Sequence, residues 1–126
     1  MSYTLNKVQI IGHLAQDPEM RQTSTGNLIA NMAIATSEEW KTPEGEKKSR
    51  VEYHRVVVFG NFADTCSKHL RKGDKVYVEG ILQTNVWENE NGEKRYKTEI
   101  VSKSMIFLKL KSDNKPKDSG LSDDDI

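Results

Sequence analysis

Apolar side chains recur at every second position in several separate stretches of this chain, and this period constrains the fold more than any other feature. One run consists of Leu28, Ala30, Met32 and Ile34, and another begins at Val76. Successive side chains of an extended strand point to opposite faces, so this spacing gives each strand one apolar face. The pattern predicts an all-β fold whose core lies between such faces.

Five strands are expected, over residues 8–14, 28–36, 50–60, 75–88 and 95–101. We expect the first to bend or bulge at Gly12 and to stop before Asp17-Pro18. Residues 41–49 are polar and predict a long exposed hairpin loop. Asn91-Gly92 predicts a tight hairpin turn, and Gly80 a bend within the fourth strand. Residues 105–110 either extend the last strand or form a contact surface.

One helix is expected between the third and fourth strands. Asn61 is placed to cap it, Phe62, Ala63, Cys66 and Leu70 fall near one side, and Arg71-Lys72-Gly73 stops it. Five strands with a helix in this position are typical of a small closed barrel. A chain of 126 residues suffices for one such domain and not for two.

The formal net charge of zero hides an asymmetry between the body of the chain and its end. Residues 112–126 carry two lysines against five aspartates, net −3, which leaves 17 basic and 14 acidic residues, net +3, in residues 1–111. We expect a folded domain over residues 1–111 and a short disordered acidic tail over residues 112–126. The mildly positive domain favours a polyanionic partner.

The sequence also predicts the compartment. No apolar run approaches the roughly 20 residues that span a bilayer, so no membrane contact is expected. The N-terminus shows neither a secretory signal nor a transit peptide. Cys66 is the single cysteine and is expected to be a small buried apolar residue in a reducing compartment. We therefore expect a cytoplasmic protein.

Aromatic side chains stand beside cations along one strand face and where strands run out into polar loops. The aromatics are Trp40, Tyr53, Phe59 and Trp87, and the cations nearest to three of them are Arg55 and Arg95. Unpaired bases stack on such rings, at about 1 to 3 kcal/mol per base, while Lys and Arg attract phosphates. The arrangement predicts binding to a single-stranded nucleic acid without strong sequence preference. The alternative is that these aromatics are ordinary core residues, and it predicts that they are buried.

No constellation for catalysis, metal binding or cofactor binding is visible in the sequence. His13 and His69 have no partner at metal-ligand spacing, and one cysteine cannot build a thiolate site. Adjacent Glu38 and Glu39 point to opposite sides of an extended segment, which suits paired acid and base chemistry poorly. The chain has neither a phosphate-binding glycine loop nor a nucleophile motif. We expect no enzyme, no metal and no cofactor.

Several separated motifs resemble those of bacterial single-stranded DNA-binding proteins over residues 3–111. They are Asn6-Lys7-Val8, Gly12, Gln16-Asp17-Pro18-Glu19 with Arg21, Ala35-Thr36-Ser37-Glu38-Glu39-Trp40, Glu52-Tyr53-His54-Arg55-Val56-Val57-Val58-Phe59-Gly60 and Leu70-Arg71-Lys72-Gly73-Asp74-Lys75-Val76-Tyr77-Val78-Glu79-Gly80. The resemblance implies an OB-fold, the five-stranded oligonucleotide-binding barrel. It further implies a nucleoid-associated homotetramer that protects single-stranded DNA during replication, recombination and repair.

The resemblance also assigns residues to roles. It implies base stacking on Trp40, Tyr53, Phe59 and Trp87, with Tyr53 standing where relatives often have tryptophan. The cations expected to contact phosphates are Lys7, Arg21, Arg55, Lys72 and Arg95. His54 lies on the strand face opposite Tyr53, and we expect it to pack or to lie near a subunit contact.

The sequence departs from this family pattern in two places. Gln83 and Asn85 stand where relatives often carry arginine, which removes cations from part of the phosphate track. The acidic end, Asp123, Asp124, Asp125 and Ile126, resembles the family's docking segment for replication and repair proteins but lacks its Pro-Phe. The main alternative function is a related barrel that serves replication restart or binds RNA.

Overall fold

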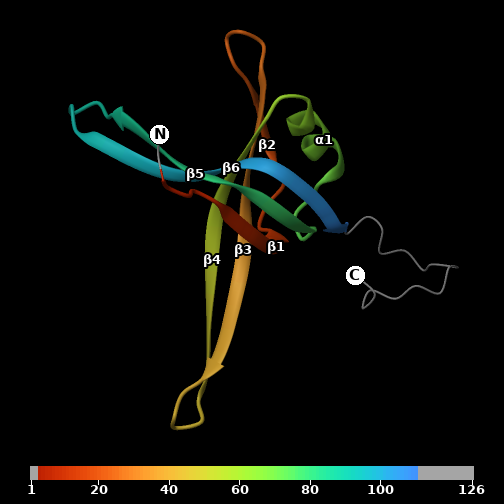
Figure 1. The fold of residues 1–126 in the computed structure, drawn as a ribbon, viewed down its shortest axis with the longest axis vertical. Helices are drawn as coiled ribbons and strands as arrows, with labels where there is room; N and C mark the ends of the chain where they lie inside the picture. Colours follow the sequence, from red (N-terminus) through yellow and green to blue (C-terminus); the bar gives the residue numbers. More distant parts are fainter. Residues whose placement is uncertain (1–2, 111–126) are drawn as a thin grey trace, which may run out of the picture.

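The computed structural model describes residues 3–110, which form six strands and one helix. In chain order they are β1 (Val8–Leu14), β2 (Glu19–Gln22), β3 (Leu28–Lys41), β4 (Lys47–Phe59), α1 (Asn61–His69), β5 (Lys75–Glu88) and β6 (Lys94–Lys109). Figure 1 shows the β3–β4 and β5–β6 hairpins running out from the body of the molecule in different directions. The expected acidic tail lies outside the described residues.

Five of the strands close into the barrel that the sequence predicts. The hydrogen-bonded order is β1-β5-β6-β4-β3, and a short pairing that includes Leu14 and Ile34 joins β3 back to β1. All neighbouring pairs are antiparallel except β4 and β6, which run parallel where Val56 faces Ile100. Because α1 lies between the third and fourth barrel strands in chain order, the arrangement is the expected OB-fold.

The sixth strand, β2, is not predicted by the sequence. It pairs with the start of β3, from Glu19 opposite Asn31 to Gln22 opposite Leu28, along the edge that β1 takes up further on. A strand of four residues is too short to show a clear period of two. Its consequence is that Arg21 lies on the sheet surface beside β3.

The β3–β4 hairpin is longer than expected, and the last strand takes the longer of its two predicted forms. The β3–β4 ladder continues without interruption to Lys41 opposite Lys47, so the loop comprises only residues 42–46, and the prediction of a loop over residues 41–49 was wrong. The polar composition reflects a two-stranded ribbon with water on both faces, which resembles a loop in sequence. Likewise β6 is continuous, so that residues 105–109 extend the last strand.

Two glycines allow close contacts between strands. The register of β1 with β5 is unbroken through Gly12, so no bulge forms there, but a Cβ at this position would overlap the carbonyl oxygen of Ala35. The β5–β6 register shifts twice, between Lys75 and Val76 and between Glu79 and Gly80, and at the second shift Lys103 of β6 has no partner in the ladder. A Cβ on Gly80 would overlap the carbonyl oxygen of Val101. Beyond this point the side chains of β5 from Leu82 onward are exposed.

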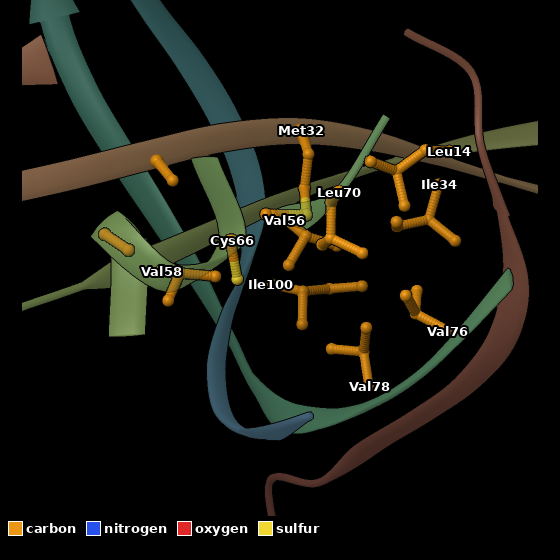
Figure 2. Packing of buried hydrophobic residues seen from close by; sticks show 12 residues of the cluster. Leu14, Met32, Ile34, Val56, Val58, Cys66, Leu70, Val76, Val78 and Ile100 are labelled. Atoms are coloured by element: carbon orange, nitrogen blue, oxygen red, sulfur yellow. The ribbon is translucent and has the colours of Figure 1, made fainter. Parts of the chain in front are cut away.

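The core lies between the inner faces of the barrel strands and α1 (Figure 2). It contains Leu14, Ala30, Met32, Ile34, Val56, Val58, Ala63, Cys66, Leu70, Val76, Val78 and Ile100. The helix contributes Ala63 and Cys66, and Leu70 follows at its end. The expected cap by Asn61 was wrong, because Asn61 is the first helical residue and Gly60, at φ 82°, precedes it without a side-chain cap. That positive φ favours glycine.

Two side-chain contacts tie loops to the barrel. The amide of Asn6 donates to the carbonyl oxygen of Leu82 at 2.8 Å and accepts from its N–H at 2.8 Å, as a strand residue would. The carboxylate of Asp17 accepts from the backbone N–H of Lys72 at 2.7 Å. The turn after α1 is thereby held against the turn between β1 and β2.

Candidate nucleic-acid interface

Residues that face one another across neighbouring strands share a face of the sheet, so the register defines a surface. We use the name outer face for the residues opposite to the core on β2, β3, β4, β6 and β5. They are Glu19, Arg21, Ile29, Asn31, Ala33, Ala35, Tyr53, Arg55, Val57, Phe59, Lys97, Glu99, Arg95, Gln83, Asn85 and Trp87. Three of the four predicted stacking aromatics and three of the predicted cations belong to this one face.

The aromatic side chains are exposed, in contrast to the core alternative. Tyr53 is 66% exposed, Phe59 53%, Trp87 47% and Trp40 39%. Tyr53 and Phe59 point the same way from β4 and are six positions apart, about 20 Å along the strand at 3.4 Å per residue. Trp87 stands on the β5–β6 hairpin directly opposite Arg95. These rings can therefore receive bases at separate points along one path.

Trp40 does not belong to the outer face. It is paired with Lys48 near the end of the β3–β4 hairpin, whereas Tyr53 is paired with Ala35. Because Trp40 is an odd number of positions from Ala35, it projects from the opposite side of the hairpin. The sequence places Trp40 correctly at a strand end beside a cation, but the register separates it from the outer face.

A cavity of about 350 Å³ opens on the outer face between β2, β3, β4 and β6. Arg21, Arg55, Lys97 and Tyr53 line it, together with Asn31 and His54. The combination of an exposed ring with three cations suits a base and the phosphates beside it. His54 comes from the opposite side of β4, as expected, and its Nε2 lies 2.9 Å from the hydroxyl of Thr36.

The two predicted cations that do not belong to the outer face, Lys7 and Lys72, lie at its margins. Lys72 lines a neighbouring hollow with Asp17 and Pro18, and Gln16 and Glu19 line both hollows, so the two adjoin. Lys7 lies 3.7 Å from the carboxylate of Glu79, and Arg95 lies 3.8 Å from Glu93. Both pairs are exposed and contribute little to stability, so the cations can exchange partners at low cost.

Glu79 belongs to an exposed polar cluster beside the barrel. The hydroxyl of Tyr77 donates to its carboxylate at 2.7 Å, and Lys7 stands nearby. The hydrogen bond from Tyr77, followed by the charge of Lys7, holds the pKa of Glu79 below its usual range. The carboxylate stays ionised and keeps Lys7 at this edge of the surface.

Among residues 3–110, no three His, Cys, Asp or Glu side chains gather closely enough to hold a metal ion. The helix that the structure describes there is too short and too polar to cross a membrane. Cys66 is buried as expected, and burial raises the pKa of its thiol to about 12.

The structure adds site residues that sequence reasoning missed. Lys97, Asn31 and Gln16 line the cavity, and the almost fully buried carboxylate of Glu99 lies 3.2 Å from the Nζ of Lys97. Lys97 is two positions from Arg95 on the same strand, so alternation along this strand could have placed it on the face of Arg95. Alternation along β3 also places Asn31 on this face, beside Ala33, whereas Gln16 lies between β1 and β2 and carries no such signal.

Comparisons with known proteins agree with this geometry. The model of the single-strand binding protein family matches residues 5–108. Single-stranded DNA-binding protein 1 of Chlorobaculum tepidum is 48% identical over 112 residues, which cover 88% of this chain and 69% of that protein.

Two solved structures are similar in fold. The Plasmodium falciparum SSB in complex with ssDNA superposes with a TM-score of 0.76 at 34% identity, over 85% of this chain and 97% of the other. A deletion mutant of the single-stranded DNA binding protein from Thermus aquaticus gives a TM-score of 0.73 at 30% identity, over 86% of this chain and 52% of the other.

Proposed function

The chain belongs to the single-strand binding protein family, and we propose that it binds and protects single-stranded DNA during replication, recombination and repair. The observation that carries this proposal is the alignment of exposed Tyr53, Phe59 and Trp87 with Arg21, Arg55 and Arg95 on the outer face. The similar Plasmodium falciparum protein was solved with ssDNA. The cytoplasm, at the nucleoid, is the compartment in which we propose this activity.

The mechanism is stacking combined with phosphate attraction. Bases of a single strand expose their faces and stack on the rings, whereas the bases of a duplex are already stacked on one another. Every base has such a face, so binding shows no strong sequence preference. The rings project from paired strands, which hold them in place before DNA arrives and reduce the entropic cost of binding. Binding without catalysis is the proposed activity.

We propose that the DNA path extends beyond the outer face. Lys72 borders the hollow next to the cavity, Lys7 stands at the edge of β1, and Trp40 faces the other side of the β3–β4 hairpin. A strand that contacts all of them has to pass around the hairpin. Such a path fits DNA that wraps around an assembly of several subunits.

The proposed assembly is a homotetramer. An apolar stripe supports it, because exposed Ile11 faces half-buried Tyr77 across β1 and β5, and Tyr77 faces exposed Ile106 across β5 and β6. Apolar surface of this kind marks contacts between proteins. Sedimentation at micromolar concentration tests the proposal, and a monomer would contradict both the tetramer and wrapping.

We also propose that the acidic end of the chain recruits replication and repair proteins. Asp123, Asp124, Asp125 and Ile126 would dock in a basic pocket with an apolar floor. Pull-downs from a bacterial lysate with the full chain and with a chain that ends at residue 111 test it. Identical captured proteins would contradict it.

A fluorescence titration tests the central proposal. Poly-pyrimidine single-stranded DNA should quench the emission of Trp40 and Trp87, and duplex DNA should bind much more weakly. RNA of the same sequence provides the third arm, and preferential binding of RNA would support the alternative function instead. Affinity should fall with salt, with a slope of about −0.7 per neutralised phosphate. Equal affinity for duplex DNA would contradict the proposal.

A further inference from the structure

On the outer face, β5 carries the uncharged residues Gln83 and Asn85, but the strand beside it carries a cation. Asn85 lies directly opposite Lys97 across the β5–β6 ladder. Directly opposed residues of an antiparallel pair have Cβ atoms about 4.5 to 5.5 Å apart on the same face. A long cation at position 97 can therefore reach the surface that a cation at position 85 would occupy.

A nearly buried carboxylate orders these two side chains. Asn85 donates from its Nδ2 to Oε1 of Glu99 at 2.6 Å, and the Nζ of Lys97 lies 3.2 Å from Oε2. The side chain of Lys97 is 33% exposed, whereas that of Glu99 is 8% exposed. The Glu99 side chain is thus largely shielded from solvent, whereas part of the Lys97 side chain remains accessible.

From this geometry we infer that Lys97 is a phosphate-binding residue of the DNA track and that Asn85 and Glu99 are its positioning residues. The inference rests on the proposed binding of single-stranded DNA and assigns the phosphate contact in the part of the track where Gln83 and Asn85 provide no charge. Lys97 also lines the cavity that holds Tyr53 and Arg55. A phosphate at Lys97 would follow a base stacked on Tyr53.

Glu99 does not cancel the proposed contact. An ammonium group has three N–H donors, and the carboxylate oxygen at 3.2 Å takes only one of them. The other two can donate to phosphate oxygens. The Lys97 side chain is more accessible to a phosphate than the Glu99 side chain, and the second carboxylate oxygen already accepts a hydrogen bond from Asn85.

A structural role for Lys97 makes a different prediction. If Lys97 only balances the buried charge of Glu99, its removal destabilises the fold, because an unpaired buried charge is costly. It would then leave the salt dependence of DNA binding unchanged. The slope of log affinity against log salt therefore separates the two roles.

The test uses the full chain with Lys97→Gln and Glu99→Gln together. This double variant removes both members of the pair, so it leaves no unpaired charge and does not change the net charge. The matched control is Asp64→Asn with Lys68→Gln, which removes an ion pair at 3.0 Å on the helix, away from the outer face. Poly-pyrimidine single-stranded DNA is the probe, with tryptophan fluorescence as the readout.

The expected slope of the Lys97 and Glu99 variant is smaller in magnitude by about 0.7, the value for one phosphate on a single strand. The ratio of wild-type to variant affinity should accordingly fall about fivefold between about 50 and about 500 mM salt. The control should keep the wild-type slope. An unchanged slope in the Lys97 and Glu99 variant, with wild-type protein that binds single-stranded DNA, would overturn the inference alone. Wild-type protein that does not prefer single-stranded DNA would overturn the proposed function itself.

A rescue on the partner strand tests the placement. Adding Asn85→Arg to the Lys97→Gln variant returns a cation to the same surface from β5, beside the same carboxylate. The slope should return to the wild-type value. A slope that stays reduced would show that position 85 does not reach the phosphate and would overturn the cross-strand assignment.

Discussion

Trp87 and Tyr96 lie on neighbouring strands of the β5–β6 hairpin but project from its opposite faces, because Trp87 pairs with Arg95 and Tyr96 pairs with Val86. Both rings are well exposed. The hairpin therefore contains a proposed stacking residue on the outer face and an exposed aromatic on its other face, outside the proposed DNA path.

Trp87→Ala should weaken binding of single-stranded DNA by about 1 to 3 kcal/mol, because one stacked base loses its platform. Tyr96→Ala removes a ring of similar exposure and should leave affinity unchanged. Both variants should unfold near the wild-type temperature, since neither ring is in the core. Titration with single-stranded DNA measures affinity and thermal melts measure stability. Equal loss of affinity would contradict the assignment of the DNA contact on this hairpin to the face of Trp87.

Trp40→Ala should also weaken binding by about 1 to 3 kcal/mol, with little change in stability. If Trp40 instead served the core, its truncation would cost roughly 3 to 5 kcal/mol of folding free energy. Since Trp40 lies on the other side of the β3–β4 hairpin from Tyr53, the effect should require DNA long enough to pass around it. Short oligonucleotides serve as the control, and they should bind the wild type and the variant with equal affinity.

Gly80→Ala should destabilise the barrel by about 1 to 3 kcal/mol, because the new Cβ overlaps the backbone carbonyl of Val101. Backbone cannot move aside as a flexible side chain can. Chemical denaturation measures the loss. A variant as stable as the wild type would show that β5 and β6 can separate locally at this point.

The thiol of Cys66 should contribute a loss of stability in alkaline solution. Burial raises its pKa from 9.0 to about 12, so between these values the unfolded chain loses a proton that the folded chain keeps. The contribution is fully present below pH 9.0 and is lost as pH rises toward 12. Cys66→Ala should show a weaker decline over this range in denaturation experiments. Native protein should also resist a thiol alkylating reagent at neutral pH, and rapid labelling would contradict the buried thiol.

Deletion of residues 112–126 should tighten binding of single-stranded DNA modestly, and more at low salt than at high salt. The deleted segment carries a net charge of −3 and is tethered to a domain of +3, so it competes with DNA for the cations. Salt screens this competition. Replacing Asp123, Asp124 and Asp125 with Asn should reproduce the effect at full chain length, and unchanged affinity at low salt would contradict it.

Local sequence determined most of the fold. The period of two in residues 28–34 and 76–78 assigned the core faces correctly, because alternation follows from the geometry of a single strand and needs no partner. The same reasoning placed Tyr53, Arg55 and Phe59 on one side of β4. The hairpin turn at Asn91-Gly92 could also be predicted, because its signal lies in two adjacent residues and needs no contact from elsewhere in the chain.

Only the tertiary structure decided which faces meet. Trp40 and Tyr53 lie on opposite faces of the β3–β4 hairpin, and Lys97 lies opposite Asn85. Pairing between strands sets this register, and a shift of one residue would move a side chain to the other face. The short strand β2 exists because β3 offers it a free edge, and it carries Arg21 to the cavity. Cross-strand contacts of this kind depend on the closed barrel as a whole, so a pattern read along one strand does not contain them.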